Sequence, residues 1–392
     1  MATEIIMLTA LALLAWTYLL YPALVLSLAA IKDRRKEKRT RQNASSDHHL
    51  PSVSVLMSVY NEAKVIEEKM RSLVASDYPY DLTEFIIGSD ASDDNTGIIM
   101  HKLSSGNSRI KFISYKERRG KPAVLNDLVS EASGEILVIT DANVMFSPDT
   151  IRLLAERISV PGTGLCDATV VPRTEDESGI TRQENFYSRF ETAIKRAEGI
   201  LWNTMPGPYG GCYAIRRELF PHLPANTLVD DLFIGLTVMK SGFASSNIRE
   251  ARVYEDTQPG MAEQFSRRVR IAAGSYQNLF RFGFFPSRKL SASFAFFTHK
   301  VLRWLTPLFL ILFFMTTVIL SVSSQFYFCV SAIQLIFIFL STLDLLLDRY
   351  GRKICYQRYV TQFLMMNAAL IAGFARAAGG IRSGIWEPTK RV

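Results

Sequence analysis

Cysteines are scarce in this 392-residue chain, and the four that occur show no paired spacing: Cys166, Cys212, Cys329 and Cys355. That pattern argues against a disulfide framework and a zinc site, and it is typical of a protein whose soluble part is cytosolic. The chain also lacks an aromatic-studded basic stripe, which argues against nucleic-acid binding. It has no Gly-x-Gly-x-x-Gly fingerprint and no phosphate-loop signature, so dinucleotide and P-loop sites are disfavoured.

Apolar residues make up 48% of the chain and concentrate at its two ends, which predicts a membrane protein with a soluble middle. Residues 5–31 are long enough to span a bilayer. Because Glu4 and a long apolar run replace the basic start and short core of a signal peptide, we expect an uncleaved anchor. The Lys/Arg-rich residues 32–41 predict that this flank is cytoplasmic and the N-terminus outside.

The C-terminal part predicts further membrane contacts. Residues 275–297 are aromatic and basic, as in a helix that lies at the membrane interface. Residues 301–322 and 326–347 are clear spanning segments. Residues 360–373 are apolar but short, so the sequence leaves open whether they span and on which side the tail lies. The net charge of +8 sits largely beside apolar segments, which indicates lipid contact and topology.

The middle of the chain alternates strand and helix patterns. Strands are expected at 53–60, 85–89, 110–115 and 135–140, and helices at 61–75, 94–103 and 121–131. Such alternation implies right-handed βαβ units in a parallel sheet, an architecture that binds nucleotides.

Each of these strands leads into polar residues, and the strand at 135–140 ends in Asp141-Ala142-Asn143. Ligands bind at the carboxyl ends of parallel strands, and two oxygen donors at this spacing can share one hard cation. An Asx-rich turn would explain the triplet equally well by itself. Asp90 and Lys121 follow two other strands. The carboxylate of Asp90 can accept hydrogen bonds from a base or a ribose, and the charge of Lys121 can neutralise a diphosphate.

Four segments carry a resemblance to a known family. Residues 51–62 resemble its opening strand, 86–96 its acidic nucleotide-gripping turn, and 120–126 its Gly-Lys-x-x-x-Leu-Asn helix start. Thr140-Asp-Ala-Asn143 resembles its Asp-x-Asp element, with Asn143 as a departure. On these motifs the chain resembles the membrane-embedded family-2 glycosyltransferases, the branch that includes cellulose, hyaluronan and poly-N-acetylglucosamine synthases.

The resemblance implies an α/β GT-A fold, with a Rossmann-like, mixed but mostly parallel sheet flanked by transmembrane helices. It assigns binding of the nucleotide sugar to Tyr60, Glu62, Asp90 and Lys121. It also implies that Asp141 and Asn143 hold Mg²⁺ or Mn²⁺. One carboxylate in place of two implies a weaker or more labile metal site.

The second half carries two further motifs of that family. Residues 207–216 form a Gly-rich bend, which the resemblance makes an acceptor-side loop with Gly210, Gly211 and Cys212. Residues 229–243 resemble the Glu-Asp motif, so that Asp231 is the catalytic base and Asp230 takes the Glu position. Acids at a helix start are also favourable on electrostatic grounds alone.

Residues 264–274 resemble the Gln-x-x-Arg-Trp motif. Anchored on Gly274, the alignment puts Arg267 in the Gln position, Arg270 in the Arg position and Ile271 in the Trp position. Anchored on Gln264, it puts Arg267 and Arg268 in the Arg and Trp positions. We prefer the first alignment, which assigns catalytic roles to Arg270 and Arg267. The missing Trp leaves open whether transfer is processive.

These expectations divide the chain into an anchor at 1–31, a basic cytosolic linker at 32–50, the GT-A domain at 51–258, motif-bearing interface helices at 259–298, and a C-terminal membrane region with its tail at 299–392. The predicted activity is inverting transfer from a UDP-sugar to a growing polysaccharide at the bacterial cytoplasmic membrane, with membrane lipids and export subunits as partners. Single-sugar transfer to a lipid carrier is the alternative. A catalytically silent nucleotide- or polysaccharide-binding receptor is the non-enzyme alternative.

Overall fold

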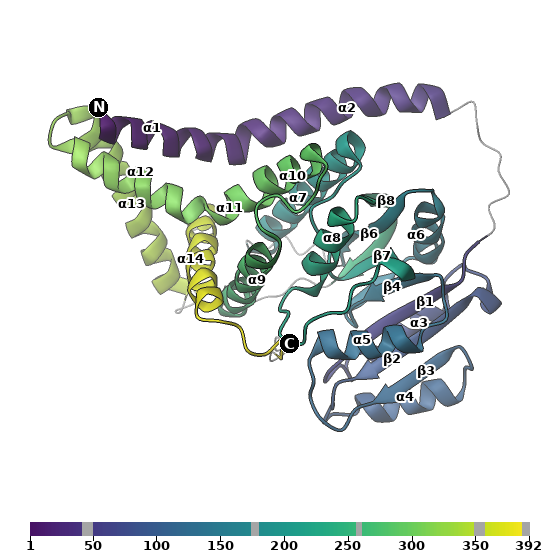
Figure 1. Cartoon of the computed structure of the whole chain (residues 1–392). Coiled ribbons are helices and arrows are strands. Elements are labelled where there is room, and N and C mark those ends of the chain that lie inside the picture. The colour runs from purple at the N-terminus through teal and green to yellow at the C-terminus, as the bar shows by residue number, and fades with distance from the viewer. Residues whose placement is uncertain (41–49, 174–179, 256–260, 349–356, 386–392) are drawn as a thin grey trace.

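The computed structural model describes residues 1–40, 50–173, 180–255, 261–348 and 357–385. It consists of an α/β domain built on one sheet and a set of long apolar helices from both ends of the chain (Figure 1). Helices from the two ends lie side by side, because α1 (Ala2–Ala15) packs along α12 (Thr306–Ser321).

The predicted parallel half-sheet is confirmed. Its strands are β1 (Val53–Val59), β2 (Thr83–Ser89), β3 (Ile110–Ser114) and β4 (Ile136–Thr140), in the spatial order β3-β2-β1-β4. Neighbours in this half are all parallel, so their carboxyl ends meet at one edge. The continuous apolar runs of β1 and β4 suit strands that are buried on both faces.

The second half of the sheet makes it mixed. Next to β4 lies β7 (Cys212–Arg216), which is antiparallel to it and to β6 (Thr163–Pro172). Beyond β6 follow β8 (Ala244–Glu255) and β5 (Val144–Phe146), which completes eight strands. The mixed, mostly parallel sheet predicted by the resemblance is therefore confirmed.

Helices cover both faces of the sheet. Alternate residues of β1 enter separate cores: Val55 and Met57 pack with α3 (Ile66–Val74), α4 (Thr96–Ser105) and α6 (Thr150–Ser159), whereas Leu56 packs with α5 (Lys121–Glu131). This is the period-two alternation of a strand. Helix α3 begins five residues after the predicted start, because residues 61–65 form a turn in which Asn61 has a positive φ of 55°.

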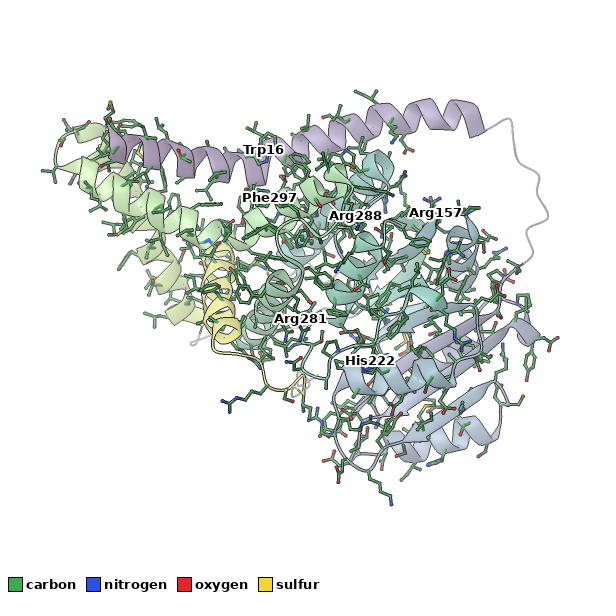
Figure 2. All side chains as sticks on the ribbon, viewed as in Figure 1. Trp16, Arg157, His222, Arg281, Arg288 and Phe297 are labelled. Atoms are coloured by element: carbon green, nitrogen blue, oxygen red, sulfur yellow. The ribbon has the colours of Figure 1, made fainter. Side chains whose placement is uncertain are left out.

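The N-terminal 39 residues of helix run without a break through α1, η1 (Trp16–Leu20) and α2 (Tyr21–Thr40). In Figure 2 Trp16 lies beside Phe297, where this long helix passes the segment formed by α10 (Leu290–Phe296), η4 (Phe297–Val301) and α11 (Leu302–Trp304). Between α11 and α12 the axis bends by 55°, so the predicted span at 301–322 contains the break of a bent helix pair and is not one straight helix.

Three described helices are long and apolar enough to cross a membrane: residues 2–33, α13 (Gln325–Asp348) and α14 (Arg358–Ala378); the bent pair makes up to four. Helix α14 extends the segment expected at 360–373 and packs along α9 (Met261–Phe282). After α14 the chain returns to the α/β domain, where Gly384 N donates to Ala225 O (3.2 Å) and Asn226 Nδ2 donates to Ile381 O (2.8 Å).

Candidate active site

A cavity of about 740 Å³ opens where the parallel strands end, and it continues toward the membrane helices. Most of the predicted site residues line it, although they come from seven separate segments of the chain. These are Tyr60, Glu62, Asp90, Lys121, Asp141, Asn143, Gly210, Gly211, Asp230, Asp231, Arg267 and Arg270. The structure therefore brings together the motifs that the sequence presents apart.

The turn after β4 is held by an ion pair. Lys121, the first residue of α5, donates from Nζ to Oδ1 of Asp141 at 2.8 Å and lies 3.6 Å from Oδ2 of Asp230. Burial by itself would raise the pKa of Asp141, but the charge of Lys121 outweighs it and holds that pKa below its usual value. The same pairing raises the pKa of Lys121 above its usual value despite burial. Asp141 is therefore a carboxylate at neutral pH.

The loop before α5 is organised by Asp90, which directly follows β2. Its Oδ1 accepts a hydrogen bond from Arg119 N (2.7 Å) and its Oδ2 accepts one from Gly120 N (2.9 Å). Asp90 thus positions the loop that leads into Lys121, a task beyond the base or ribose contact predicted for it. Tyr60 lies nearby with its ring under the guanidinium of Arg118, 3.7 Å from the ring centroid.

Asp230 and Asp231 open α8 (Asp230–Lys240), as the motif predicts. Oδ1 of Asp231 accepts a hydrogen bond from Leu232 N (2.7 Å), which fixes the carboxylate at the helix start. Burial, followed by the charge of Asp230, raises the pKa of Asp231 to about 6. A carboxylate with that pKa is still ionised at neutral pH and has the raised proton affinity that suits a general base.

The Gly-rich loop that was predicted to lie on the acceptor side packs against Asp231. A Cβ atom on Gly210 would come within 2.5 Å of Oδ2 of Asp231, so glycine leaves the carboxylate its space. Cys212 is a correction to the prediction. It is the first residue of β7, its side chain is fully buried in the sheet core among residues such as Val138 and Ala214, and it does not line the cavity.

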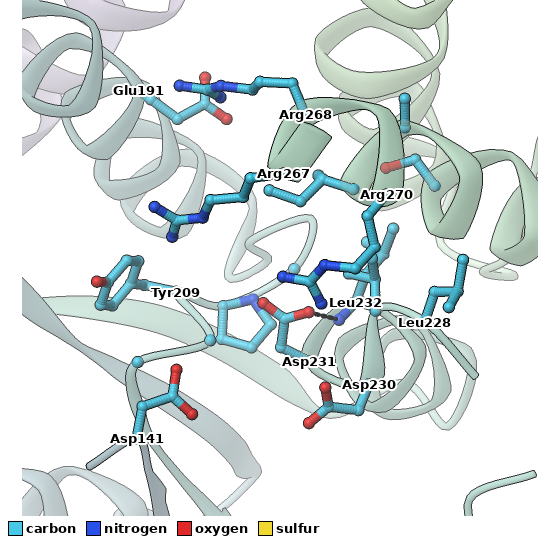
Figure 3. A pocket seen from close by; sticks show the side chains of 18 of the residues that line it. Asp141, Glu191, Tyr209, Leu228, Asp230, Asp231, Leu232, Arg267, Arg268 and Arg270 are labelled. Atoms are coloured by element: carbon cyan, nitrogen blue, oxygen red, sulfur yellow. Dashed lines mark hydrogen bonds between the residues drawn. The ribbon is translucent and has the colours of Figure 1, made fainter. Parts of the chain in front are cut away.

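The three arginines of α9 point in different directions (Figure 3). Arg270 reaches toward Asp231, and Arg267 extends toward Tyr209. Arg268 turns instead toward Glu191, and its guanidinium lies 5.8 Å from the ring centroid of Tyr187. This arrangement supports the alignment anchored on Gly274, in which Arg270 and Arg267 occupy the motif positions.

Two charged residues that sequence reasoning missed lie next to the turn after β4. Lys69 is fully buried beneath the turn after β4, where its Nζ donates to Thr140 Oγ1 (2.9 Å) and to the carbonyl oxygen of Val144. A lysine in the apolar stripe of α3, between Ile66 and Leu73, was a signal that could have found it. The other is Glu255, a single acid at the end of β8 with no motif around it.

The far end of the cavity lies among helices that the motifs do not cover. It is lined there by α7 (Ile180–Trp202), η4, α11 and α14, with the charged residues Glu191, Lys195, Lys300 and Arg303 and the apolar residues Trp304, Phe363, Met366 and Leu370. Glu191 forms ion pairs with both Lys300 and Arg303. The cavity therefore joins a polar reaction site to an apolar recess.

The oxygen donors of the turn after β4 fit a hard divalent cation. Asp141 supplies a carboxylate that is 39% exposed, and Asn143 supplies an amide oxygen two residues on. Within the described part of the chain no group of three or more His, Cys, Asp or Glu side chains could enclose an ion by itself. Such a site suits an ion that also takes phosphate oxygens from a bound ligand.

Comparisons with known proteins agree with this geometry. Residues 54–223 match the model of the family Glycosyl transferase family 2. The chain is 23% identical over 351 residues to the poly-beta-1,6-N-acetyl-D-glucosamine synthase of Staphylococcus epidermidis, covering 83% of this chain and 84% of that protein. It is 24% identical over 282 residues to the probable glycosyltransferase YdaM of Bacillus subtilis, covering 69% and 66% respectively.

Among solved structures, the mannosyltransferase PcManGT from Pyrobaculum calidifontis, in complex with GDP-Man and Mn²⁺, superposes with a TM-score of 0.69. The match covers 95% of this chain and 99% of that one at 23% identity, and it shows the fold. The predictions of fold, family and enzyme class are thereby confirmed over the receptor alternative. Residues 54–223 are a Glycosyl transferase family 2 domain with a GT-A fold, and the chain is identified as a nucleotide-sugar glycosyltransferase.

Proposed function

We propose that the protein is an inverting glycosyltransferase that moves a sugar from a UDP-sugar to a growing β-linked polysaccharide. The observation that carries this proposal is the placement of Asp231, a carboxylate with a raised pKa, between the Gly-rich loop and Arg270. Similarity over most of the chain to a poly-beta-1,6-N-acetyl-D-glucosamine synthase supports the polysaccharide product.

In the proposed reaction an acceptor hydroxyl oxygen attacks the anomeric carbon from the face opposite the diphosphate. The bond from that carbon to the diphosphate breaks, and its electron pair leaves with UDP. The hydroxyl proton passes to Asp231, and such general-base help is worth about 10²- to 10⁴-fold in rate. Attack on an α-linked donor therefore yields a β-linkage. Arg270 and Arg267 stabilise the negative charge that develops on the diphosphate.

A divalent cation, Mg²⁺ or Mn²⁺, completes the proposed site. Asp141 and Asn143 would hold it, and it would supply positive charge for the leaving diphosphate. The mannosyltransferase PcManGT, which shares this fold, was solved with GDP-Man and Mn²⁺, and this supports the choice of a divalent cation. Lys121, paired with Asp141, adds a fixed positive charge on the same side.

A second acceptor class is favoured by one observation. The cavity runs from Asp231 into the apolar recess formed by Trp304 and the α14 residues Phe363, Met366 and Leu370. A lipid carrier could enter that recess with its chain while its head group reaches the base. Single-sugar transfer to a lipid-linked acceptor therefore stays the alternative to chain extension.

We also propose that the α/β domain and the C-terminal residues 380–385 share the cytoplasmic side. The Lys/Arg-rich residues after the first apolar segment support this orientation. The hydrogen bonds of Gly384 and Asn226 support a tail on the same side as the catalytic domain. Residues 2–33, the bent pair and α13 would then be the spans, with α14 at the cytoplasmic interface.

The test is to offer radiolabelled UDP-sugars to the purified protein in nanodiscs, with Mn²⁺, and to size the labelled product. A polymer ladder with β-linkages by NMR is expected, and a single-sugar lipid product would favour the alternative. Asp231→Asn keeps the shape of the side chain and removes the base. It should bind UDP-sugar nearly as well as the unchanged protein while transfer falls at least about a hundredfold. Near-normal transfer by this variant, or an α-linked product, would refute the mechanism.

A further inference from the structure

Glu255 ends β8 inside the cavity, beside the turn that carries Asp141 and Asn143. The antiparallel pairing of β5 with β8 sets Glu255 opposite Val144, the residue after Asn143. Asn143 and Glu255 are 112 residues apart in the sequence, and only the register of this edge strand brings them together. No motif of the sequence includes Glu255.

In the hydrogen bond between Glu255 and Asn143, chemistry determines which residue is the donor and which is the acceptor. A carboxylate only accepts hydrogen bonds, so Asn143 must present its Nδ2 to Oε1 of Glu255, at 2.9 Å. Because the amide is planar, its Oδ1 then points away from Glu255. An amide oxygen is a ligand that hard divalent cations accept. Glu255 thereby selects the amide orientation in which Nδ2 makes this hydrogen bond and Oδ1 lies on the side away from Glu255.

The second oxygen of Glu255 reaches the acceptor loop. Oε2 accepts a hydrogen bond from the hydroxyl of Tyr209. Tyr209 is held at its other end, because its backbone N donates to Oδ2 of the buried Asp167 at 2.8 Å. Its ring covers Gly211, whose carbonyl accepts a hydrogen bond from Asp141 N at 3.1 Å. One carboxylate thus connects the cation turn with the acceptor loop.

We propose that Glu255 is a positioning residue that orients the Asn143 amide for the cation and ties Tyr209 to the same turn. Its negative charge would compensate for the amide of Asn143, which stands where Asp-x-Asp has a second carboxylate. This inference rests on the proposed divalent-cation site. Groups that orient a metal ligand typically change metal affinity by about 10- to 100-fold when they are removed.

The experiment measures Mn²⁺ binding directly, from the electron paramagnetic resonance signal of free Mn²⁺ titrated into the full-length protein in nanodiscs with saturating UDP. Glu255→Ala should weaken Mn²⁺ binding at least about tenfold. The exchanged pair N143D/E255Q reverses the donor and the acceptor, because the amide then stands at position 255 and the carboxylate at position 143. It should bind Mn²⁺ at least as tightly as the unchanged protein. Glu250→Ala, an exposed acid on the same strand, is the matched control and should change nothing.

Unchanged Mn²⁺ affinity in Glu255→Ala would overturn the inference. So would an exchanged pair that binds as weakly as Glu255→Ala, since orientation of residue 143 would then not be the cause. Thermal unfolding of each variant separates a misfolded protein from a weakened site, and Tyr209→Phe, which keeps the ring, tests the second contact. It should leave Mn²⁺ affinity unchanged and raise the KM for the acceptor. Failure of the unchanged protein to bind Mn²⁺ with UDP would instead refute the proposed function.

Discussion

Gly210 and Asp231 are packed so closely that a Cβ atom on Gly210 would lie 2.5 Å from Oδ2 of Asp231. Gly210 does not have a positive φ, so its backbone would accept alanine without strain. Position 210 therefore requires a glycine because any larger residue would enter the space that the Asp231 carboxylate occupies. This makes Gly210 a sensitive probe of whether the position of Asp231 matters.

Gly210→Ala should displace the Asp231 carboxylate and lower transfer by about a hundredfold, the loss expected when a catalytic group is misplaced by about 1 Å. UDP binding, measured by calorimetry, should change little, because the nucleotide side is built by other segments. Gly97→Ala is the matched control, since a Cβ there meets nothing within 4 Å. Full activity of Gly210→Ala would mean that Asp231 need not occupy its present place.

The pH dependence of transfer should report Asp231. A base works only when it is deprotonated, and burial together with Asp230 raises the pKa of Asp231 to about 6. We expect kcat/KM to rise about tenfold per pH unit below 6 and to level off above it. The residual kcat/KM of Asp231→Asn should not show this rise with pH. A limb near pH 4 in the unchanged protein would mean that the carboxylate is not desolvated as the structure implies.

Asp141→Ala should abolish the cation dependence of transfer, because it removes the charged member of the Asp141/Asn143 pair. Transfer by the unchanged protein should fall to background in excess EDTA and recover when Mn²⁺ is added. Asp141→Ala should stay at background in both conditions. Asp81→Ala, which changes an exposed acid that does not line the cavity, serves as control. Full turnover of Asp141→Ala in EDTA would rule out the proposed cation role.

Arg270→Ala should damage transfer at least about tenfold more than Arg268→Ala, because only Arg270 points at the carboxylates of the reaction site. A cation aimed at developing charge in a water-poor site contributes more than one that is turned away. Steady-state kcat values of the two variants, with protein amounts matched, provide the comparison. Equal losses would favour the alignment anchored on Gln264.

Membrane topology can be tested with an impermeant thiol reagent on intact cells, in a Cys329→Ser background that removes the exposed cysteine of the described residues. Cysteines placed at Ser45 and Thr389 should stay unlabelled if the linker and tail are cytoplasmic. A cysteine at Ser323, in the exposed turn between α12 and α13, should be labelled. Labelling at Ser45 would reverse the proposed orientation, and labelling at Thr389 alone would make α14 a span.

The fold was largely predictable because its signals are local. Each of these signals arises within one stretch of chain: the short apolar runs of the strands, helix starts such as Lys121, and the long apolar segments. Helix α3 began later than predicted because Asn61 adopts a left-handed turn conformation, which no apolar pattern encodes. Cys212 was assigned to the cavity because it follows two site glycines, but β7 alternates and turns that side chain into the core.

The sequence alone determined the class of chemistry. The residues that follow the parallel strands include a carboxylate and a lysine, and the carboxyl ends of such strands form the edge where ligands bind. Only the tertiary structure decided which groups support them. Lys69 reaches the turn after β4 from a buried helix, and Glu255 reaches Asn143 from a strand 112 residues away. Such pairings depend on sheet register and helix packing, which are set by the whole core, so no single stretch of sequence carries them.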